Sequence, residues 1–332
     1  MRGQVVVVTG ASAGVGRATA VEFAKHGWRV ALLARGGEGL AGLEGAREEV
    51  ESAGGEALVV PADVAVQREV EEAAARAEQE WGAIDVWVND AMATIFCDAI
   101  HISPEDFRRA TEVTYLGTVW GTMAALKRMK PRDRGAIVQV GSALAYRSIP
   151  LQAPYCGAKS AIRGFTDSLR SELIHDHSRV HLTMVQLSAF NTPQFDWGRT
   201  CLPNRPKPLG KIFQPEVAAR GIYWAATHRR RELWVGWPAV QAIIGTRVIP
   251  GFLDRMLAFQ AYEGQEGNRP VAPGRRDNLH APVAGDHGAH GRFDNRAVSR
   301  SAQLWLNIHR LPVAVAIVLI LALILAITLW RG

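Results

Sequence analysis

A tyrosine and a lysine four residues apart are the side chains best placed to do chemistry. Tyr155 and Lys159 lie in a segment, 154–177, whose pattern predicts a helix, so both side chains share one helix face. A free tyrosine has a pKa of about 10, and a neighbouring ammonium lowers that pKa by favouring the phenolate. Ser142 follows a predicted strand, 136–140, and places a hydroxyl at its end. These three groups suit proton transfer to or from an oxygen that a hydroxyl holds in place.

A glycine cluster near the N-terminus suits a phosphate-bearing cofactor. The string from Thr9 to Gly16 connects a predicted strand, Val5–Val8, to a helix that begins at Val15. Glycines allow a backbone to approach a pyrophosphate closely, and the helix N-terminus offers free N–H groups and a positive dipole end. The sequence therefore predicts a cofactor site made by Gly10, Ser12, Gly14, Val15 and Gly16.

Strands and helices alternate along most of the chain. Short apolar runs are predicted as strands at 5–8, 29–34, 57–61, 84–89, 136–140, 180–187 and 232–236. Amphipathic segments between them are predicted as helices at 15–26, 38–53, 67–81, 104–129, 154–177 and 215–227. This alternation is typical of an α/β, Rossmann-type, doubly wound parallel sheet with its ligand crevice at the carboxyl ends of the strands.

The TGxxxGxG string, Ser142 and the YxxxK motif, in this order, resemble the short-chain dehydrogenase/reductase family. The resemblance covers roughly residues 5–236. It implies an oxidoreductase that interconverts an alcohol and a carbonyl with a nicotinamide cofactor. It further implies that Tyr155 is the general acid or base, that Lys159 holds the nicotinamide ribose and tunes Tyr155, and that Ser142 orients the substrate oxygen.

The same resemblance indicates the cofactor and more of its site. In that family an acidic residue after the second strand selects NAD(H), whereas this chain has Arg35 there. A guanidinium pairs well with a 2′-phosphate, so NADP(H) is expected and NAD(H) is less favoured. Arg17 either assists or is an exposed residue of the first helical turn. Further cofactor contacts are expected from Asp63, Val64, Asn89, Ala91 and Thr192.

Two positions depart from the family pattern. The family's NNAG after the fourth strand is here Asn89-Asp90-Ala91-Met92, and its helical asparagine, which helps to hold a proton-relay water, corresponds to Thr114. Thr114 is accordingly a candidate catalytic residue through its hydroxyl. The departures also keep two alternatives open: a nucleotide-binding scaffold protein with little catalysis, and an epimerase or dehydratase that uses the same cofactor.

The C-terminal third has a different composition. We expect a catalytic domain at 1–240, an extension with a flexible linker at 241–310, and a transmembrane helix at 311–330. The linker, 263–301, is rich in Gly, Pro, Arg, Asp and His. Residues 311–330 carry no charge, and twenty helical residues span about 30 Å, the thickness of a bilayer's hydrocarbon core. Arginines at 292, 296, 300 and 310 precede this segment and only Arg331 follows it, which favours a single pass with a cytoplasmic catalytic domain.

Composition narrows the partners. The net charge of +6 is mild, and no basic stretch carries interleaved aromatics, so nucleic acid is not an expected partner. The three cysteines form no CxxC motif, which favours a reducing compartment without disulfides. Histidines and aspartates in the linker lack a rigid scaffold, so no metal is expected. The expected partners are an apolar carbonyl or alcohol, the membrane, and further copies of the chain in a dimer or tetramer.

Overall fold

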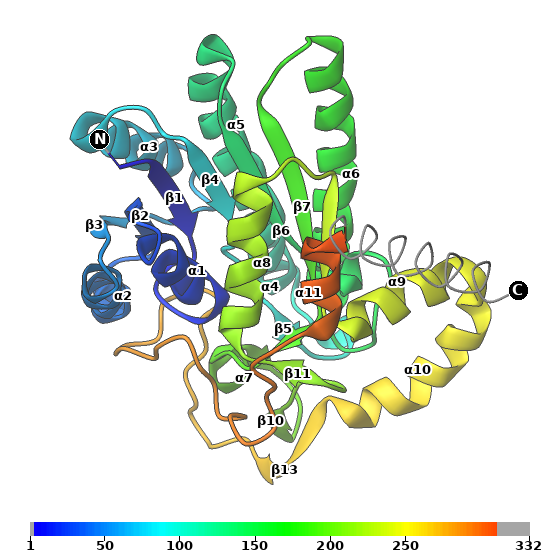
Figure 1. Ribbon diagram of the computed structural model, residues 1–332. Coiled ribbons are helices and arrows are strands. Elements are labelled where there is room, and N and C mark those ends of the chain that lie inside the picture. The colour runs from blue at the N-terminus through cyan, green and yellow to red at the C-terminus, as the bar shows by residue number, and fades with distance from the viewer. Residues whose placement is uncertain (1–2, 311–332) are drawn as a thin grey trace, which may run out of the picture.

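Seven parallel strands form one twisted sheet at the centre of the molecule (Figure 1). This computed structural model describes residues 3–310. From one edge to the other the strands are β12 (Glu232–Val235), β7 (His181–Leu187), β6 (Ala136–Ser142), β4 (Val86–Asn89), β1 (Val5–Thr9), β2 (Arg29–Ala34) and β3 (Glu56–Pro61). The strand order reverses between β1 and β4, where doubly wound sheets form their ligand crevice. The predicted α/β fold is confirmed.

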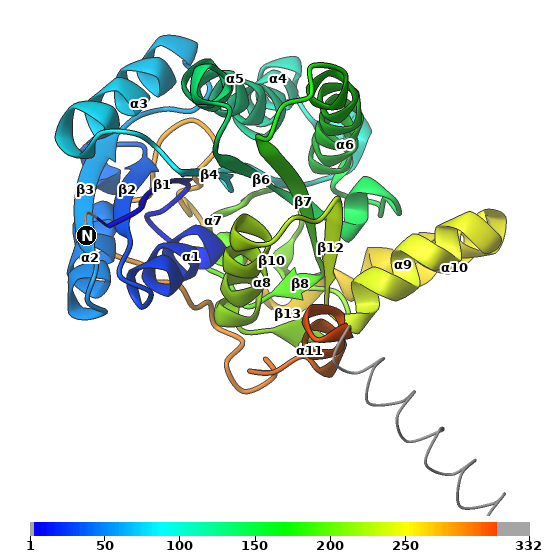
Figure 2. The same cartoon turned by 45° about the horizontal axis from the view of Figure 1, so that its top comes forward.

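Helices cover both faces of the sheet (Figure 2). One layer contains α1 (Gly14–Ala24), α2 (Leu40–Ser52) and α8 (Pro215–Thr227), and the other contains α3 (Gln67–Trp81), α4 (Pro104–Thr111), α5 (Gly117–Met129) and α6 (Ala153–His175). Alternation within β1 explains the two layers, because Val6 and Val8 pack into one core and Val5 and Val7 into the other. A strand buried on both faces requires such a continuous apolar run.

The helix predicted from Pro104 to Met129 is interrupted. A wider π turn, Glu112–Leu116, separates α4 from α5 and contains Thr114. Such turns are rare overall, and those that occur are often found at functional sites. The periodicity of apolar residues does not reveal one extra residue in a turn, so the sequence could not predict this feature.

The prediction that the cysteines stay unpaired is wrong. Cys97 and Cys201 form a disulfide with their Cα atoms 5.1 Å apart, and only Cys156 is free among the residues described. Two short parallel strands, β5 (Ile95–Phe96) and β9 (Arg199–Thr200), cause this pairing, because each cysteine directly follows one of them. The two cysteines are 104 residues apart in sequence, so cysteine spacing alone does not predict the disulfide.

Short elements lie at the carboxyl end of the sheet, which is the lower end in Figure 1. They are α7 (Gln194–Trp197), the pair β8 (Ala189–Phe190) and β11 (Ile212–Phe213), the pair β10 (Asn204–Pro206) and β13 (Glu266–Pro270), and the helices α9 (Trp237–Val248) and α10 (Pro250–Gly264). Helices α9 and α10 project from the body as a hairpin (Figures 1 and 2).

The predicted flexible linker is packed instead. Residues 271–301, here called the arm, form no helix and no extended strand, yet they run across the crevice below α1 and α2 (Figure 1). Leu279 is fully buried and Phe293 nearly so, and these two anchors explain why a segment of polar composition is held in place. The arm ends at α11 (Ala302–Ile308), which packs beside β12. No helix within residues 3–310 is long and apolar enough to cross a bilayer, and the predicted transmembrane segment, 311–330, lies outside the described residues.

Candidate active site

A cavity of about 850 Å³ lies at the carboxyl ends of the central strands. Its size falls within the roughly 300–1,000 Å³ of small-molecule and cofactor sites. Most of the predicted site residues line it, namely Gly10, Ser12, Gly14, Val15, Arg35, Asp63, Val64, Ala91, Ser142, Tyr155, Lys159 and Thr192. The structure therefore collects on one cavity side chains from six strands' ends and two helices.

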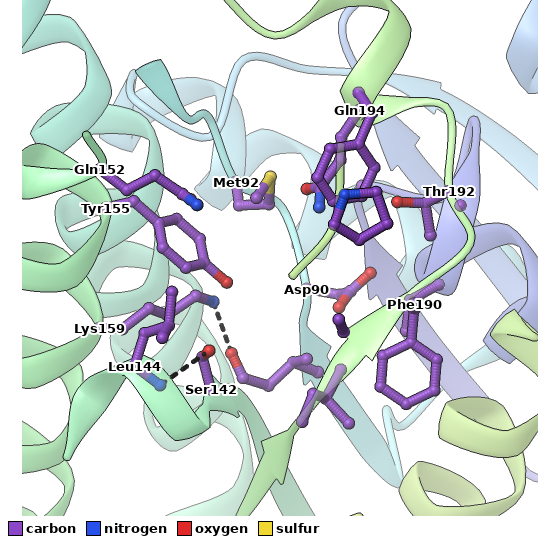
Figure 3. A pocket seen from close by; sticks show the side chains of 18 of the residues that line it. Asp90, Met92, Ser142, Leu144, Gln152, Tyr155, Lys159, Phe190, Thr192 and Gln194 are labelled. Carbon is purple, nitrogen blue, oxygen red and sulfur yellow. Dashed lines mark hydrogen bonds between the residues drawn. The ribbon is translucent and has the colours of Figure 1, made fainter. Parts of the chain in front are cut away.

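The tyrosine, lysine and serine point into the same part of this cavity (Figure 3). Tyr155 and Lys159 lie on the first turns of α6, and the Lys159 Nζ is 5.5 Å from the centre of the Tyr155 ring. The Lys159 ammonium donates to the carbonyl oxygen of Val140 at 2.6 Å, which fixes the side chain against β6. Ser142 ends β6, and its hydroxyl accepts from the Leu144 N–H. An oxygen atom bound between Ser142 and Tyr155 would be within reach of both hydroxyls.

Burial changes the protonation of these groups. It raises the pKa of Tyr155 above its usual value, and a hydrogen bond with Ser142 offsets part of that rise. Burial lowers the pKa of Lys159, whereas the nearby carboxylate of Asp90 raises it. Burial likewise raises the pKa of Asp90, against the attraction of the Lys159 ammonium. The site thus couples a phenol, an ammonium and a carboxyl group in one poorly solvated space.

Asp90 is expected to set the alkaline limit of activity. Its carboxylate stabilises the Lys159 ammonium, so Asp90→Asn leaves only desolvation acting on Lys159 and lowers the lysine pKa further. Because a protonated Lys159 favours the Tyr155 phenolate, which alcohol oxidation needs, the alkaline limb of the kcat/KM profile for alcohol oxidation should move to lower pH. A profile measured from pH 5 to 10 checks this, with the exposed Glu105→Gln as a control. An unchanged alkaline limb would contradict the coupling.

The glycine cluster leaves no room for side chains. A Cβ on Gly16 would lie 2.3 Å from the carbonyl oxygen of Gly10, and one on Gly10, whose φ is +73°, would lie 2.9 Å from the Cα of Ala91. The loop therefore packs directly on the segment after β4. Gly16 does not line the cavity, so its contribution is to bring α1 close to this loop. The N–H of Gly14, at the start of α1, donates to the carbonyl oxygen of Gly288 in the arm at 3.1 Å.

Arg35 lines the cavity at the end of β2 and is also bound by the arm. Its guanidinium donates to the backbone carbonyls of Asn278 at 2.5 Å and of Leu279 at 3.4 Å. Burial lowers the pKa of Arg35, with Asp63 opposing that effect. Asp63 in turn forms an ion pair with Arg109. A guanidinium is therefore present where a 2′-phosphate is expected, with the Asp63 carboxylate also in the lining, and the arm forms one wall of this part of the cavity.

Two predicted residues lie behind the cavity wall. The Asn89 amide accepts from the Trp87 indole and donates to Thr122 and Gln139, so it joins β4 to α5 and β6. The Thr114 hydroxyl accepts from the N–H of Ala93 and donates to the carbonyl of the same residue. Neither residue lines the cavity, so in this structure both position the segment 90–92 that does.

The sequence reasoning missed the contribution of the arm. Asn278, Pro282, Val283, Gly285 and His287 all line the cavity. The side-chain oxygen of Asn278 is buried and has no hydrogen-bond partner among residues 3–310, which suits a ligand donor such as an adenine amino group.

An ion pair holds the arm over α1. Arg17 is 2% exposed and pairs with Glu49 of α2 and with Asp286 of the arm, so the prediction of an exposed Arg17 is wrong. Partners separated by 269 residues leave no signal in one sequence. The described part of the chain contains no group of three or more His, Cys, Asp or Glu side chains that could hold a metal ion.

The glycine cradle, the Arg35 guanidinium and the Asn278 oxygen, which has no partner among residues 3–310, fit a phosphorylated dinucleotide. A family profile described as short chain dehydrogenase matches residues 4–197, more than half of the chain. The chain belongs to the short-chain dehydrogenase family. It is an oxidoreductase with a Rossmann-type sheet.

Three similar proteins illustrate how far this dehydrogenase resembles others. An uncharacterized oxidoreductase of Bacillus subtilis, YxnA, is 31% identical over 96% of this chain and 88% of its own, so the similarity extends into the C-terminal third. The 17-beta-hydroxysteroid dehydrogenase 13 of rat is 34% identical over 66% of this chain and 70% of its own. The solved structure of an alcohol dehydrogenase from Thermococcus sibiricus, complexed with 5-hydroxy-NADP, is 26% identical with a TM-score of 0.60, and covers 70% of this chain and 95% of the other.

Proposed function

We propose that this dehydrogenase is an NADP(H)-dependent enzyme that interconverts an apolar alcohol and the corresponding carbonyl compound. The observation that carries the proposal is the convergence of Tyr155, Lys159 and Ser142 on a cavity whose other end holds the glycine cradle and Arg35. The bound nicotinamide supplies or accepts the hydride. Every other task falls to side chains of the chain itself.

Each of the three side chains has a separate task in the proposed reaction. Ser142 donates a hydrogen bond to the substrate oxygen and so fixes the carbon that reacts. Tyr155 gives its proton to that oxygen during reduction and takes it back during alcohol oxidation. Lys159, held by the Val140 carbonyl, keeps a positive charge beside the phenol and opposes the rise in the Tyr155 pKa that burial causes.

Arg35 is expected to select the phosphorylated cofactor. The position after β2 holds Arg35 and no acidic side chain, so its guanidinium can pair with the 2′-phosphate of NADPH, which NADH lacks. Arg35→Ala should therefore raise the KM for NADPH by at least about tenfold and change the KM for NADH little. Arg276→Ala is the matched control, since Arg276 is exposed, pairs with Glu38 and does not line the cavity. Equal rises in the KM for NADPH and the KM for NADH would instead indicate that Arg35 acts only by holding the arm.

The far end of the cavity favours an apolar substrate. The larger apolar side chains that line the cavity are Met92, Leu144, Ile149, Phe190, Trp197, Leu209, Leu253, Met256 and Leu257, alongside the polar Gln152, Gln241 and Gln260. Such a lining suits a hydrocarbon chain or ring next to the carbonyl. The likeness to 17-beta-hydroxysteroid dehydrogenase 13 supports this substrate class.

One assay tests the proposed function as a whole. Full-length protein in detergent is mixed with NADPH or NADP⁺ and with matched short and long aldehydes, ketones and alcohols, and absorbance of the reduced cofactor is followed. We expect turnover that improves with apolar chain length and prefers NADP(H). Retained cofactor binding without turnover across the whole panel would favour the scaffold alternative.

Membrane attachment through residues 311–330 is part of the proposal. The twenty uncharged residues support it, and the arginines that precede them support a cytoplasmic body. The Cys97–Cys201 disulfide argues in the opposite direction about the compartment, since such bonds persist mainly in oxidising surroundings. We also propose a dimer or tetramer, supported by exposed apolar side chains on α4 and α5, Phe107 and Met123.

A further inference from the structure

The hairpin of α9 and α10 carries apolar side chains on two sides. Its inner face lines the cavity with Leu253, Met256 and Leu257 of α10 and with Ala242 of α9. These positions recur at the three- and four-residue spacing of a single helix face. The apolar side chains of the inner face are therefore explained, because they line the substrate end of the cavity.

The outer face has no such explanation. Val248, Phe252 and Phe259 are 71%, 63% and 77% exposed, and Ile244 and Ile249 are about half exposed. Within residues 3–310 nothing covers these side chains, although large apolar patches on a soluble surface are uncommon. A helix that is apolar on both faces requires burial on both.

The outer face continues onto α11. The side chain of Gln303 in α11 accepts from the N–H of Gly236, the residue just before α9, so the two helices begin side by side. Trp305 and Leu306 of α11 and Trp237 of α9 are each half exposed or more. Together these residues and those of the preceding paragraph define what we call the outer apolar surface.

The chain itself indicates what covers this surface. After α11 it continues from Arg310 directly into the twenty uncharged residues 311–330. The outer apolar surface thus starts where the proposed membrane segment begins. It also has the composition of a lipid interface, since Trp237, Trp305 and Tyr262 are exposed aromatics with polar groups, and the exposed Arg247 and Arg255 suit anionic headgroups.

We infer that the outer apolar surface of α9, α10 and α11 rests in the headgroup region of a lipid bilayer, with the inner face of the same hairpin holding the apolar substrate. The statement about the substrate rests on the proposed reaction, and the statement about lipid rests on the proposed membrane attachment through residues 311–330. The arrangement places the substrate end of the cavity one helix away from the phase in which an apolar substrate dissolves.

A fluorophore on the outer apolar surface tests the contact with lipid. Phe259→Cys in the full-length protein is labelled with an environment-sensitive dye and reconstituted into phosphatidylcholine–phosphatidylglycerol vesicles. Labelling is selective because Cys156 is buried and the other two cysteines are joined. Arg68→Cys on α3, on the opposite side of the molecule and exposed, is the control. We expect a blue-shifted emission at 259 that nitroxide-labelled lipids quench, and neither effect at 68.

Other outcomes would overturn the inference. Equal, water-like emission at both sites would mean that the surface faces solvent. A blue shift at 259 without quenching by nitroxide lipids would mean that a second copy of the chain covers it. This readout needs no turnover and is repeated with Tyr155→Phe, so a failure of the proposed reaction would not be confused with a failure of lipid contact.

A kinetic measurement tests the connection with the substrate. The double variant Phe252→Ser, Phe259→Ser should raise the KM for a long-chain substrate supplied in vesicles about tenfold. The KM for a short, water-soluble substrate should stay unchanged, since neither side chain lines the cavity. Parallel rises in both KM values would point to a disturbed cavity and would refute delivery from lipid.

Discussion

Replacement of Tyr155 by phenylalanine is expected to lower kcat about a thousandfold. The variant removes a buried phenol whose ring centre lies 5.5 Å from the Lys159 ammonium, and positioned acid–base groups contribute about 10²–10⁴ in rate. The ring stays in place, so the dissociation constant of NADP(H) should change little. Single-turnover kinetics and cofactor fluorescence titration measure the two quantities separately.

Tyr146→Phe is the matched control for that variant. Tyr146 lies near the site but does not line the cavity, and its hydroxyl donates to Glu232 at 2.7 Å. We expect its kcat to stay within a few-fold of the unmodified enzyme. If Tyr155→Phe retained full turnover, the acid–base role would be lost and the nucleotide-binding scaffold would become the better interpretation.

Gly16→Ala is expected to destroy cofactor binding. The new Cβ would lie 2.3 Å from the Gly10 carbonyl oxygen and 2.7 Å from its carbonyl carbon, both of which are backbone atoms that cannot turn aside. Either α1 moves away from the loop or the loop loses its shape, and both changes disturb the contact surface for phosphate. We expect a dissociation constant for NADPH raised at least about a hundredfold, measured by fluorescence titration, and a lower Tm.

Gly164→Ala separates this effect from a general cost of replacing glycine. Gly164 lies in α6, and nothing within 4 Å would meet its Cβ. Alanine is favoured over glycine in a helix by about 1 kcal/mol, so this variant should bind NADPH normally and melt at a slightly higher temperature. Normal NADPH binding by Gly16→Ala would show that the loop can move away from the new Cβ without losing its shape.

The sheet and the reacting groups could be predicted because their signals are local. Val5–Val8 is apolar at every position, and the glycines follow immediately, so strand, loop and helix are determined within a few residues. Tyr155 and Lys159 share a helix face for the same reason. Arg35 is predicted for the same reason, because it directly follows the strand Arg29–Ala34.

Features made by distant segments could not be predicted. Cys97 meets Cys201 only because β5 pairs with β9, and Arg17 is buried only because Asp286 returns from the far end of the chain. Thr114 was expected at the cavity, but the π turn directs its hydroxyl to the backbone of Ala93. The polar composition of the arm predicts a flexible linker, but two buried apolar side chains, Leu279 and Phe293, anchor it on the body.

The arm has a consequence for the timing of catalysis. It crosses the groove from Arg35 to Gly14 and is fastened by the ion pair between the buried Arg17 and the partly exposed Asp286, so a dinucleotide bound beneath it would be enclosed on the solvent side. If NADP(H) binds there as proposed, these contacts must open before it leaves, and we expect the departure of the used nucleotide to govern how often the enzyme begins a new cycle.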